Sequence, residues 1–128
     1  MNILRRAVLP IALALMTNFA AAGSRTGFTQ AGFEAAQQAG KPILVEIIAS
    51  WCPTCKAQAP ILGQLRSDPK FKELEVFSVD FDNQKDVVQS FKANTQSTLI
   101  VFKGSQEVGR SIGDTRKDSI EALLAKSL

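Results

Sequence analysis

The sequence predicts an α/β protein, with a central mixed β-sheet that is flanked by helices on both faces. Residues 43–49 form an apolar run without alternation, which is typical of a central strand that is covered on both sides. Stretches with helical and strand periodicity alternate along the chain, and two successive strands precede the last helix. The predicted order is therefore helix, strand, helix, strand, helix, strand, strand, helix, which gives a mixed sheet.

The first 22 residues have the three parts of an export signal. Residues 1–6 contain two arginines and no acidic residue, residues 7–19 are apolar, and three alanines precede Gly23. The alternative is a membrane anchor, but the apolar segment is shorter than the ~20 residues that a bilayer requires. We therefore expect a signal peptide over 1–22, cleavage after Ala22, a mature domain over 23–128 and a periplasmic location.

The mature domain is expected to begin with a polar segment and a helix. Thr29 is suited to cap this helix, and Phe28 and Phe33 can pack together across its first turn. Gly40 ends the helix, because glycine readily adopts the left-handed conformation found at helix ends. The central strand over 43–49 follows.

A second helix begins within the sequence Trp51-Cys52-Pro53-Thr54-Cys55-Lys56. Proline is tolerated there because the first residues of a helix have no intrahelical acceptor for their N–H groups. Pro60 should kink the helix, which ends before Ser67. Its apolar face is expected to consist of Ala57, Ile61, Leu62 and Leu65.

The second half of the chain carries three more strands. Residues 75–82 alternate with period two and predict one strand, and residues 98–102 predict another. A turn over 103–106 joins the latter to an antiparallel partner over 107–112, which Gly113 ends.

Two helices in this half have expected caps. Asn83, with Asp86 three residues later, is expected to cap a helix that runs through Phe91. Thr115, with Asp118 three residues later, is expected to open the last helix. The apolar side of that helix consists of Ile120, Leu123, Leu124 and Leu128.

The composition excludes several kinds of function. The chain has no histidine and two cysteines, so a monomer cannot offer the soft ligands of a four-coordinate zinc site. The formal net charge of +3 owes two units to the arginines of the leader, and the other basic residues are scattered. We expect no metal, no cofactor and no nucleic-acid partner.

The two cysteines are the strongest chemical signal. A Cys-X-X-Cys between a buried strand and a helix N-terminus stabilises a thiolate through the helix dipole and through free N–H donors. We expect Cys52 to be the nucleophile, with its pKa near or below neutrality, and Cys55 to resolve the mixed disulfide. An inert disulfide or half of a metal site is the alternative.

These residues resemble the thioredoxin family. The motif Trp51-Cys52-Pro53-Thr54-Cys55-Lys56, Pro60 five residues after the second cysteine, and the order of the later elements carry the resemblance over residues 28–128. The motif is also similar to that of exported thioredoxins that handle cytochrome c maturation, and residues 39–45 are similar to the thioredoxin domain of the membrane reductant conductor DsbD. The resemblance implies a thioredoxin fold, a redox-active Cys52–Cys55 disulfide and thiol–disulfide oxidoreductase activity.

Two positions depart from the family pattern. The family has a cis-proline opposite the active site, where this chain has Ser97, and a non-prolyl cis bond costs ~2.5–4 kcal/mol. We therefore expect a trans bond at Ser97. Gln96 holds the position whose main chain pairs with substrate in the family. Glu46 holds the position of the family's buried aspartate, and Ser78 holds the position of the lysine that pairs with that aspartate.

The remaining candidates surround the cysteines. Glu46 is expected to be buried, expensive to ionise, and able to accept the proton of Cys55 through a water. A solvated carboxylate at a sheet edge is the alternative. Trp51 is expected either to form a wall of the substrate groove or simply to pack. Pro53 and Thr54 are expected to adjust the balance between thiolate and disulfide, and to contact substrate.

Together these observations predict an exported thiol–disulfide oxidoreductase that reduces the disulfides of other exported proteins. Such a protein leaves each reaction oxidised, so we expect a membrane redox partner of the DsbD type. An oxidase that donates its disulfide is the nearest alternative, and a binding module that docks partners without turnover is the other.

Overall fold

The computed structural model describes residues 23–128, and the expected signal peptide over 1–22 lies outside this range. The elements in chain order are β1 (Ser24–Gly27), α1 (Gln30–Gln38), β2 (Pro42–Ile48), α2 (Pro53–Arg66), a 3-10 turn (Pro69–Phe71), β3 (Glu75–Asp80), α3 (Lys85–Ser90), β4 (Thr98–Lys103), β5 (Gln106–Ile112) and α4 (Lys117–Ala125). Within the described range, no helix has both the length and the hydropathy to cross a membrane.

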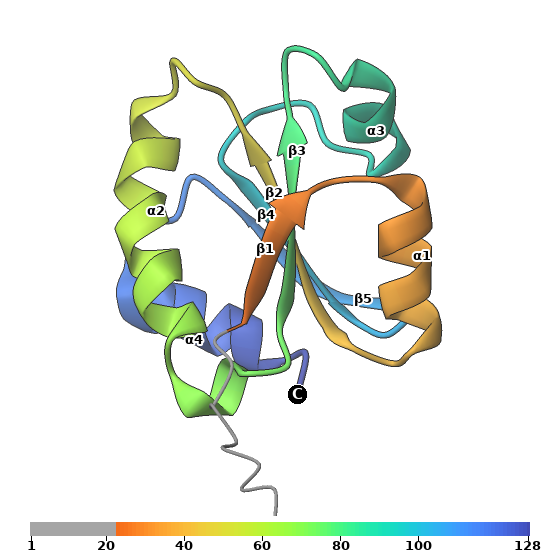
Figure 1. The fold of residues 1–128 in the computed structure, drawn as a ribbon. Helices are drawn as coiled ribbons and strands as arrows, with labels where there is room; N and C mark the ends of the chain where they lie inside the picture. Colours follow the sequence, from red (N-terminus) through yellow and green to blue (C-terminus); the bar gives the residue numbers. More distant parts are fainter. Residues whose placement is uncertain (1–22) are drawn as a thin grey trace, which may run out of the picture.

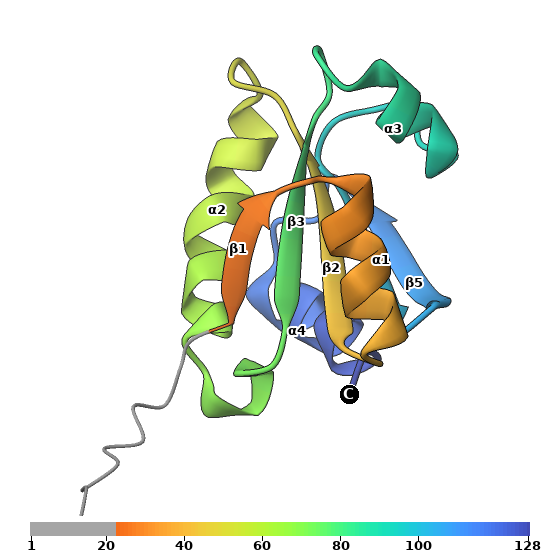
Figure 2. The same ribbon diagram turned by 45° about the vertical axis from the view of Figure 1, so that its right-hand side comes forward.

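The strands form one mixed sheet in the order β1-β3-β2-β4-β5. The first three in this order are mutually parallel, and β4 runs antiparallel to both of its neighbours. Figure 1 shows the sheet nearly edge on, with α2 and α4 on one face and α1 and α3 on the other. In the turned view of Figure 2, β1 and β5 lie at opposite edges. The predicted α/β sandwich with a mixed sheet is confirmed.

The central position of β2 explains its unbroken apolar run. Ile43, Val45 and Ile47 enter the core beneath α1 and α3. Leu44 enters the core beneath α2 and α4, on the opposite face. Because successive residues of a strand point to opposite faces, only a strand covered on both sides buries an apolar residue at every step.

Strand β1 is not among the predicted strands. All four of its residues are exposed, and none of them is a large apolar residue, so the sequence shows no apolar alternation there. The strand exists because its main chain pairs in parallel with β3, from Ser24 opposite Glu75 to Gly27 opposite Ser78. Pairing with a distant segment leaves no local signal in the sequence.

The prediction that β3 continues through Asp82 was wrong. The Asp80 carboxylate accepts the N–H groups of Asp82 and Asn83 at 3.0 and 3.2 Å, and the Asn83 side-chain amide at 2.9 Å. These bonds turn the chain out of the strand, and they lower the pKa of Asp80. Asn83 is thereby used in the turn, so it does not cap α3, whose N-cap is Gln84.

The predicted caps are correct for α1 and wrong for α4. Thr29 accepts the N–H of Gly32 at 3.1 Å and Gly40 has a φ of +69°, so both ends of α1 are as predicted. Thr115 was the wrong cap for α4, which has Arg116 at that position. The reason is that the Asp114 carboxylate takes the Arg116 N–H at 3.0 Å and turns the chain one residue later.

Candidate active site

The central strand delivers the two cysteines to the start of α2. After β2 the chain turns at Ala49, whose carbonyl accepts the N–H of Cys52 at 3.2 Å. Cys52 is the N-cap of α2, and Pro53 occupies the first turn. The Cys55 N–H points at Cys52 Sγ at 3.1 Å, so the sulfur fills the role that a serine oxygen has in ordinary caps. Cys52 and Cys55 form a disulfide.

The disulfide is mostly covered, and Trp51 beside it is not. Cys52 is 1% exposed and Cys55 8% exposed, whereas the Trp51 side chain is 54% exposed. The indole N–H donates to Asp82 at 2.7 Å, and the ring meets Phe81 edge to face with centroids 6.5 Å apart. Trp51 is therefore an exposed ring that its contacts with Asp82 and Phe81 hold beside the disulfide.

The loop before β4 faces the disulfide through the side chain of Ser97. The Ser97 hydroxyl lies 3.1 Å from Cys52 Sγ and 3.3 Å from Cys55 Sγ, and the residue is 4% exposed. Peptide bonds in residues 23–128 are all trans, as expected at Ser97, and the Ser97 φ is +62°. Gln96 is half-buried and lies next to it. The loop is thus brought to the cysteines by an unusual backbone conformation.

Gln58 is a site residue that the sequence prediction missed. It is 2% exposed, and its amide donates to the carbonyls of Ser97 at 3.3 Å and Asp114 at 2.9 Å. Ala57, which was expected on the buried face of α2, is exposed instead. A polar residue holds the inner position because its amide ties the carbonyls of two loops together.

Replacing Gln58 by leucine should therefore destabilise the protein by about 1–3 kcal/mol, because the Asp114 carbonyl loses the Gln58 donor and the Ser97 carbonyl keeps only the Gly113 N–H. Urea unfolding of the oxidised protein measures the loss. Gln64 is exposed on the same helix, so Gln64→Leu is the matched control and should change stability by less than about 0.5 kcal/mol. Equal stability of the two variants would contradict the assigned role.

Glu46 is buried, as expected, but it is paired. It is 5% exposed, and its Oε1 atom accepts from Ser78 Oγ and from Arg25 Nε, each at 2.5 Å. Ser78 is its register partner on β3, and Arg25 comes from β1. The isolated carboxyl that the sequence suggested therefore has a counter-ion, which was missed because β1 was missed.

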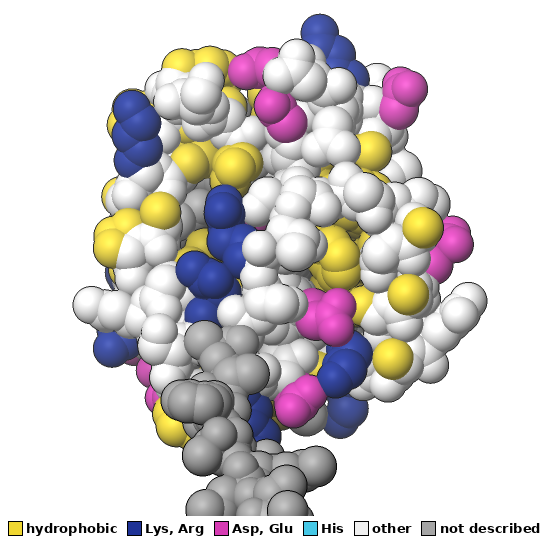
Figure 3. All heavy atoms as spheres, in the orientation of Figure 1, with side chains coloured by type: hydrophobic (Ala, Val, Ile, Leu, Met, Phe, Trp, Pro, Cys, Tyr) yellow, Lys and Arg dark blue, Asp and Glu magenta, His cyan; other side chains and the backbone are white. Residues whose placement is uncertain are grey.

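A cavity of about 200 Å³ lies beside the Glu46 carboxylate. Its lining residues are Arg25, Glu46, Ala59, Leu62, Arg66 and Val76. Figure 3 shows basic side chains gathered in the hollow between α2 and β1. The hydrogen bonds of Glu46 go to Arg25 and Ser78 and not to a sulfur, and Cys55 is not among the residues that line the cavity. A proton passing between Cys55 and Glu46 therefore needs an intervening water.

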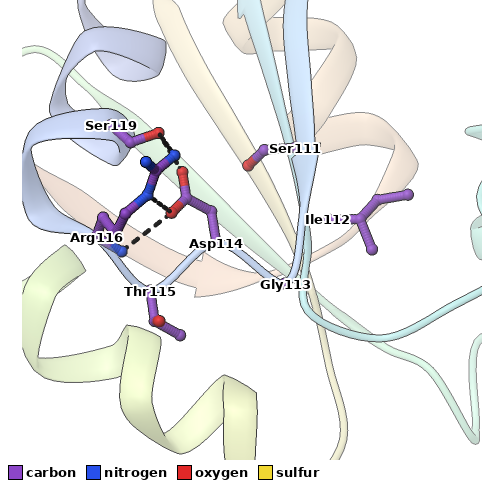
Figure 4. A pocket seen from close by; sticks show the side chains of 7 residues that line it. All are labelled: Ser111, Ile112, Gly113, Asp114, Thr115, Arg116 and Ser119. Atoms are coloured by element: carbon purple, nitrogen blue, oxygen red, sulfur yellow. Dashed lines mark hydrogen bonds and ion pairs between the residues drawn. The ribbon is translucent and has the colours of Figure 1, made fainter.

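A second polar cluster closes the loop between β5 and α4. The Asp114 carboxylate accepts from the Ser119 hydroxyl and from the backbone and side chain of Arg116, as Figure 4 shows. The hydrogen bond from Ser119 makes the largest contribution to lowering the pKa of Asp114, and the hydrogen bond from the Arg116 N–H makes the next largest. This cluster lies at an open pocket of about 520 Å³.

Because the pKa of Asp114 is lower in the folded than in the unfolded protein, its stabilising effect is complete above the unfolded value of ~3.9 and is lost as the pH falls through the folded value. We expect Asp114→Asn to be less stable than the wild type at pH 6 and to approach it below pH 3. Urea unfolding between pH 2.5 and 6 measures this. Ser119→Ala removes the main donor to the Asp114 carboxylate and should therefore weaken the pH dependence of stability. A stability difference between Asp114→Asn and the wild type that does not change with pH would contradict this prediction.

The structure therefore brings Cys52, Cys55 and Ser97 into contact and holds Trp51 beside them. Pro53 is exposed and Thr54 half-buried at the start of α2, while Glu46 lies on the sheet with its own partners. A disulfide capping a helix at the end of a central strand can exchange with external thiols. The fold and the site define a thiol–disulfide oxidoreductase.

Comparison with known proteins agrees with this class. The family model Thioredoxin matches residues 26–126. The thioredoxin of Alicyclobacillus acidocaldarius is 34% identical over 100 residues, which cover 78% of this chain and 94% of that protein. The H-type thioredoxin of Fagopyrum esculentum is 35% identical over 88 residues, covering 69% of this chain and 73% of that one. The chain belongs to the thioredoxin family.

Solved structures support the same assignment. Trxlp from Edwardsiella tarda is 41% identical with a TM-score of 0.77, and the match covers 80% of this chain and 98% of that chain. The thioredoxin NaTrxh from Nicotiana alata is 26% identical with a TM-score of 0.71, covering 84% and 93%. The predicted thioredoxin fold is confirmed, and the redox-active cysteine pair makes the protein a thiol–disulfide oxidoreductase.

Proposed function

We propose that the protein is an exported reductase that transfers electrons to the disulfides of other exported proteins. The observation that carries this proposal is the Cys52–Cys55 disulfide at the N-terminus of α2, with the Cys55 N–H on Cys52 Sγ. This geometry supports Cys52 as the nucleophile, because both the helix dipole and the N–H donor favour its thiolate.

The proposed reaction exchanges one disulfide for another. The Cys52 thiolate attacks a sulfur of the substrate disulfide, which forms a mixed disulfide and releases the other substrate sulfur as a thiolate. Cys55 then loses its proton and attacks Cys52 Sγ, which frees the second substrate thiol and restores the Cys52–Cys55 disulfide. Two electrons pass from the protein to its substrate.

The surface around the disulfide fits an extended polypeptide. Trp51, which precedes Cys52, and Ile112, at the end of β5, are exposed apolar side chains, 54% and 63% accessible. Ile112 is the register partner of Thr98, next to Ser97. We propose that the main chain of the substrate pairs with the main chain of Gln96. Pro53 and Thr54, with Ser97, complete the contact surface.

We propose that Glu46 accepts the proton that Cys55 loses during its attack, and that the proton passes through water. The support is the burial of Glu46 on the α2 face of the sheet and the cavity between β1 and α2 beside it. Arg25 pairs with the carboxylate and fixes its position at the edge of this cavity.

Replacing Glu46 by glutamine should slow disulfide reduction by about a hundredfold, because a positioned general base contributes that much or more, and it should change the pH profile of the rate. Reduction of insulin between pH 5.5 and 9 measures both. Glu73 is an exposed carboxylate that pairs with Lys41, so Glu73→Gln is the control. An unchanged rate and profile in Glu46→Gln would remove the proton-transfer role.

Export and the redox partner rest on the leader and on the resemblance of residues 39–45 to the thioredoxin domain of DsbD. An oxidising compartment traps the product as its disulfide, so a membrane protein of the DsbD type is the proposed electron donor. N-terminal sequencing of the protein from a periplasmic extract tests export, with Gly23 as the expected first residue. Recovery of the uncleaved chain in the cytoplasm would contradict it.

A redox titration against glutathione, followed through Trp51 fluorescence, tests the direction of the reaction. A reductase should have a reduction potential nearer to the ~−270 mV of thioredoxin than to the ~−120 mV of DsbA, whereas a potential near the latter would establish the oxidase instead. Insulin reduction by the dithiol form completes the test, and an inactive wild type would leave the binding module as the better proposal.

A further inference from the structure

The hydroxyl of Ser97 lies between the two reacting sulfurs. It is 3.1 Å from Cys52 Sγ and 3.3 Å from Cys55 Sγ, and Ser97 is 4% exposed. Both distances are within hydrogen-bonding range for sulfur, and burial leaves no bulk water to compete for the hydroxyl. Next to the Cys55 N–H, this is the second polar group on Cys52 Sγ.

We infer that Ser97 is a catalytic residue whose hydroxyl donates to the Cys52 thiolate in the reduced protein. The inference rests on the proposed dithiol chemistry at Cys52. A disulfide sulfur is a weak acceptor, whereas a thiolate carries a full charge and accepts strongly. The bond therefore strengthens when the disulfide is reduced, which stabilises the dithiol form and the attacking thiolate. The Ser97 oxygen remains free to accept the S–H of Cys55.

The backbone around Ser97 is built to hold the hydroxyl there. Its φ of +62° is in the left-handed region, which costs a non-glycine residue energy unless other contacts hold it. Those contacts exist, because Ser97 donates its N–H to Ile47 O at 2.8 Å and accepts from Gly113 N at 3.0 Å. Gln58 donates to the same carbonyl at 3.3 Å.

Proline is incompatible with this arrangement. Its ring fixes φ near −65°, and it has no N–H to donate to Ile47. The position therefore holds a residue that provides both a backbone donor and a side-chain donor. The departure from the family pattern replaces a rigid apolar ring with a hydrogen-bond donor that is aimed at the sulfurs.

Nearby charges are occupied elsewhere. The Asp82 carboxylate accepts from the Trp51 indole, and the Glu46 carboxylate pairs with Arg25. The Asp114 carboxylate is satisfied by its own loop and by Ser119. The hydrogen-bond donors found at Cys52 Sγ in the described residues are thus the Cys55 N–H and the Ser97 hydroxyl.

The test compares Ser97→Ala with Ser97→Gly. Both remove the hydroxyl, but glycine accepts a positive φ without strain, so the pair separates the donor from the backbone. Ser105, exposed in the β4–β5 turn, provides Ser105→Ala as the control. The Cys52 thiolate is titrated by its absorbance at 240 nm, and the equilibrium with glutathione is measured at pH 9, where the thiolate predominates.

Both Ser97 variants should raise the pKa of the Cys52 thiol by about 1, which reduces the thiolate present at pH 7 about two- to fivefold for a thiol that titrates near or below neutrality. Both should shift the glutathione equilibrium about tenfold toward the disulfide, which is about 30 mV more negative. If the Cys52 thiol titrated in both variants as it does in the wild-type protein, the inference would be overturned. An effect in Ser97→Ala that Ser97→Gly lacks, or a slower insulin reaction with unchanged titration and equilibrium, would also overturn it.

These readouts are independent of the proposed reductase role. If the wild-type protein fails to reduce insulin but the Ser97 variants still change the titration of Cys52, the proposed function fails and the inference stands. If the wild type is active and the titration is unchanged, the inference fails and the function stands.

Discussion

Replacement of Cys52 by serine should reduce insulin-disulfide reduction to the uncatalysed rate. The substrate disulfide is attacked by a thiolate, and a serine hydroxyl remains protonated at neutral pH even with the Cys55 N–H and the helix dipole directed at it. The expected loss is therefore complete rather than partial. Single-turnover assays with the reduced protein measure it.

Replacement of Cys55 by serine provides the matched comparison. Attack by Cys52 is still possible in this variant, but no second thiol is present to release the substrate. A mixed disulfide should therefore accumulate and be visible by mass spectrometry before and after reduction. If Cys52→Ser forms the mixed disulfide and Cys55→Ser does not, the assignment of nucleophile and resolving thiol is reversed.

Replacement of Phe33 by alanine should destabilise the protein by about 3–5 kcal/mol, a large part of the stability of a small domain. Phe33 is 6% exposed and is the centre of the aromatic cluster beneath α1. Its ring centroid lies 5.3–5.9 Å from those of four other rings, those of Phe28, Phe77, Phe91 and Phe102. Truncation leaves a cavity and removes edge-to-face contacts.

Urea unfolding at a fixed redox state, followed by far-UV circular dichroism, measures this loss. Gln38 is exposed near the end of the same helix, so Gln38→Ala is the control and should be nearly neutral. Since the cluster lies on the face opposite α2, the folded fraction of Phe33→Ala should keep its redox equilibrium with glutathione. A loss below about 1 kcal/mol would mean that the surrounding rings collapse into the space.

The elements that were predicted correctly have local signals. The apolar run of β2, the cap at Thr29 and the turn at Gly40 each depend on residues that are close in the chain. The elements that were misplaced depend on competition between neighbouring polar side chains. Asp80 and Asp114 both capture backbone N–H groups of the turn that follows, and each moves an element boundary by one or two residues.

The sequence by itself determined the cysteine pair and its place between a buried strand and a helix, and it favoured the burial of Glu46. These follow from spacing and apolar pattern, which are local properties. Only the tertiary structure decided what surrounds them. Arg25 reaches Glu46 because an exposed, patternless strand pairs with β3, and Ser97 reaches the sulfurs because Ile47 and Gly113 hold its backbone at a positive φ. These two contacts join residues 21 and 45 positions apart in the chain, and they depend on sheet pairing, so no local sequence pattern predicts them.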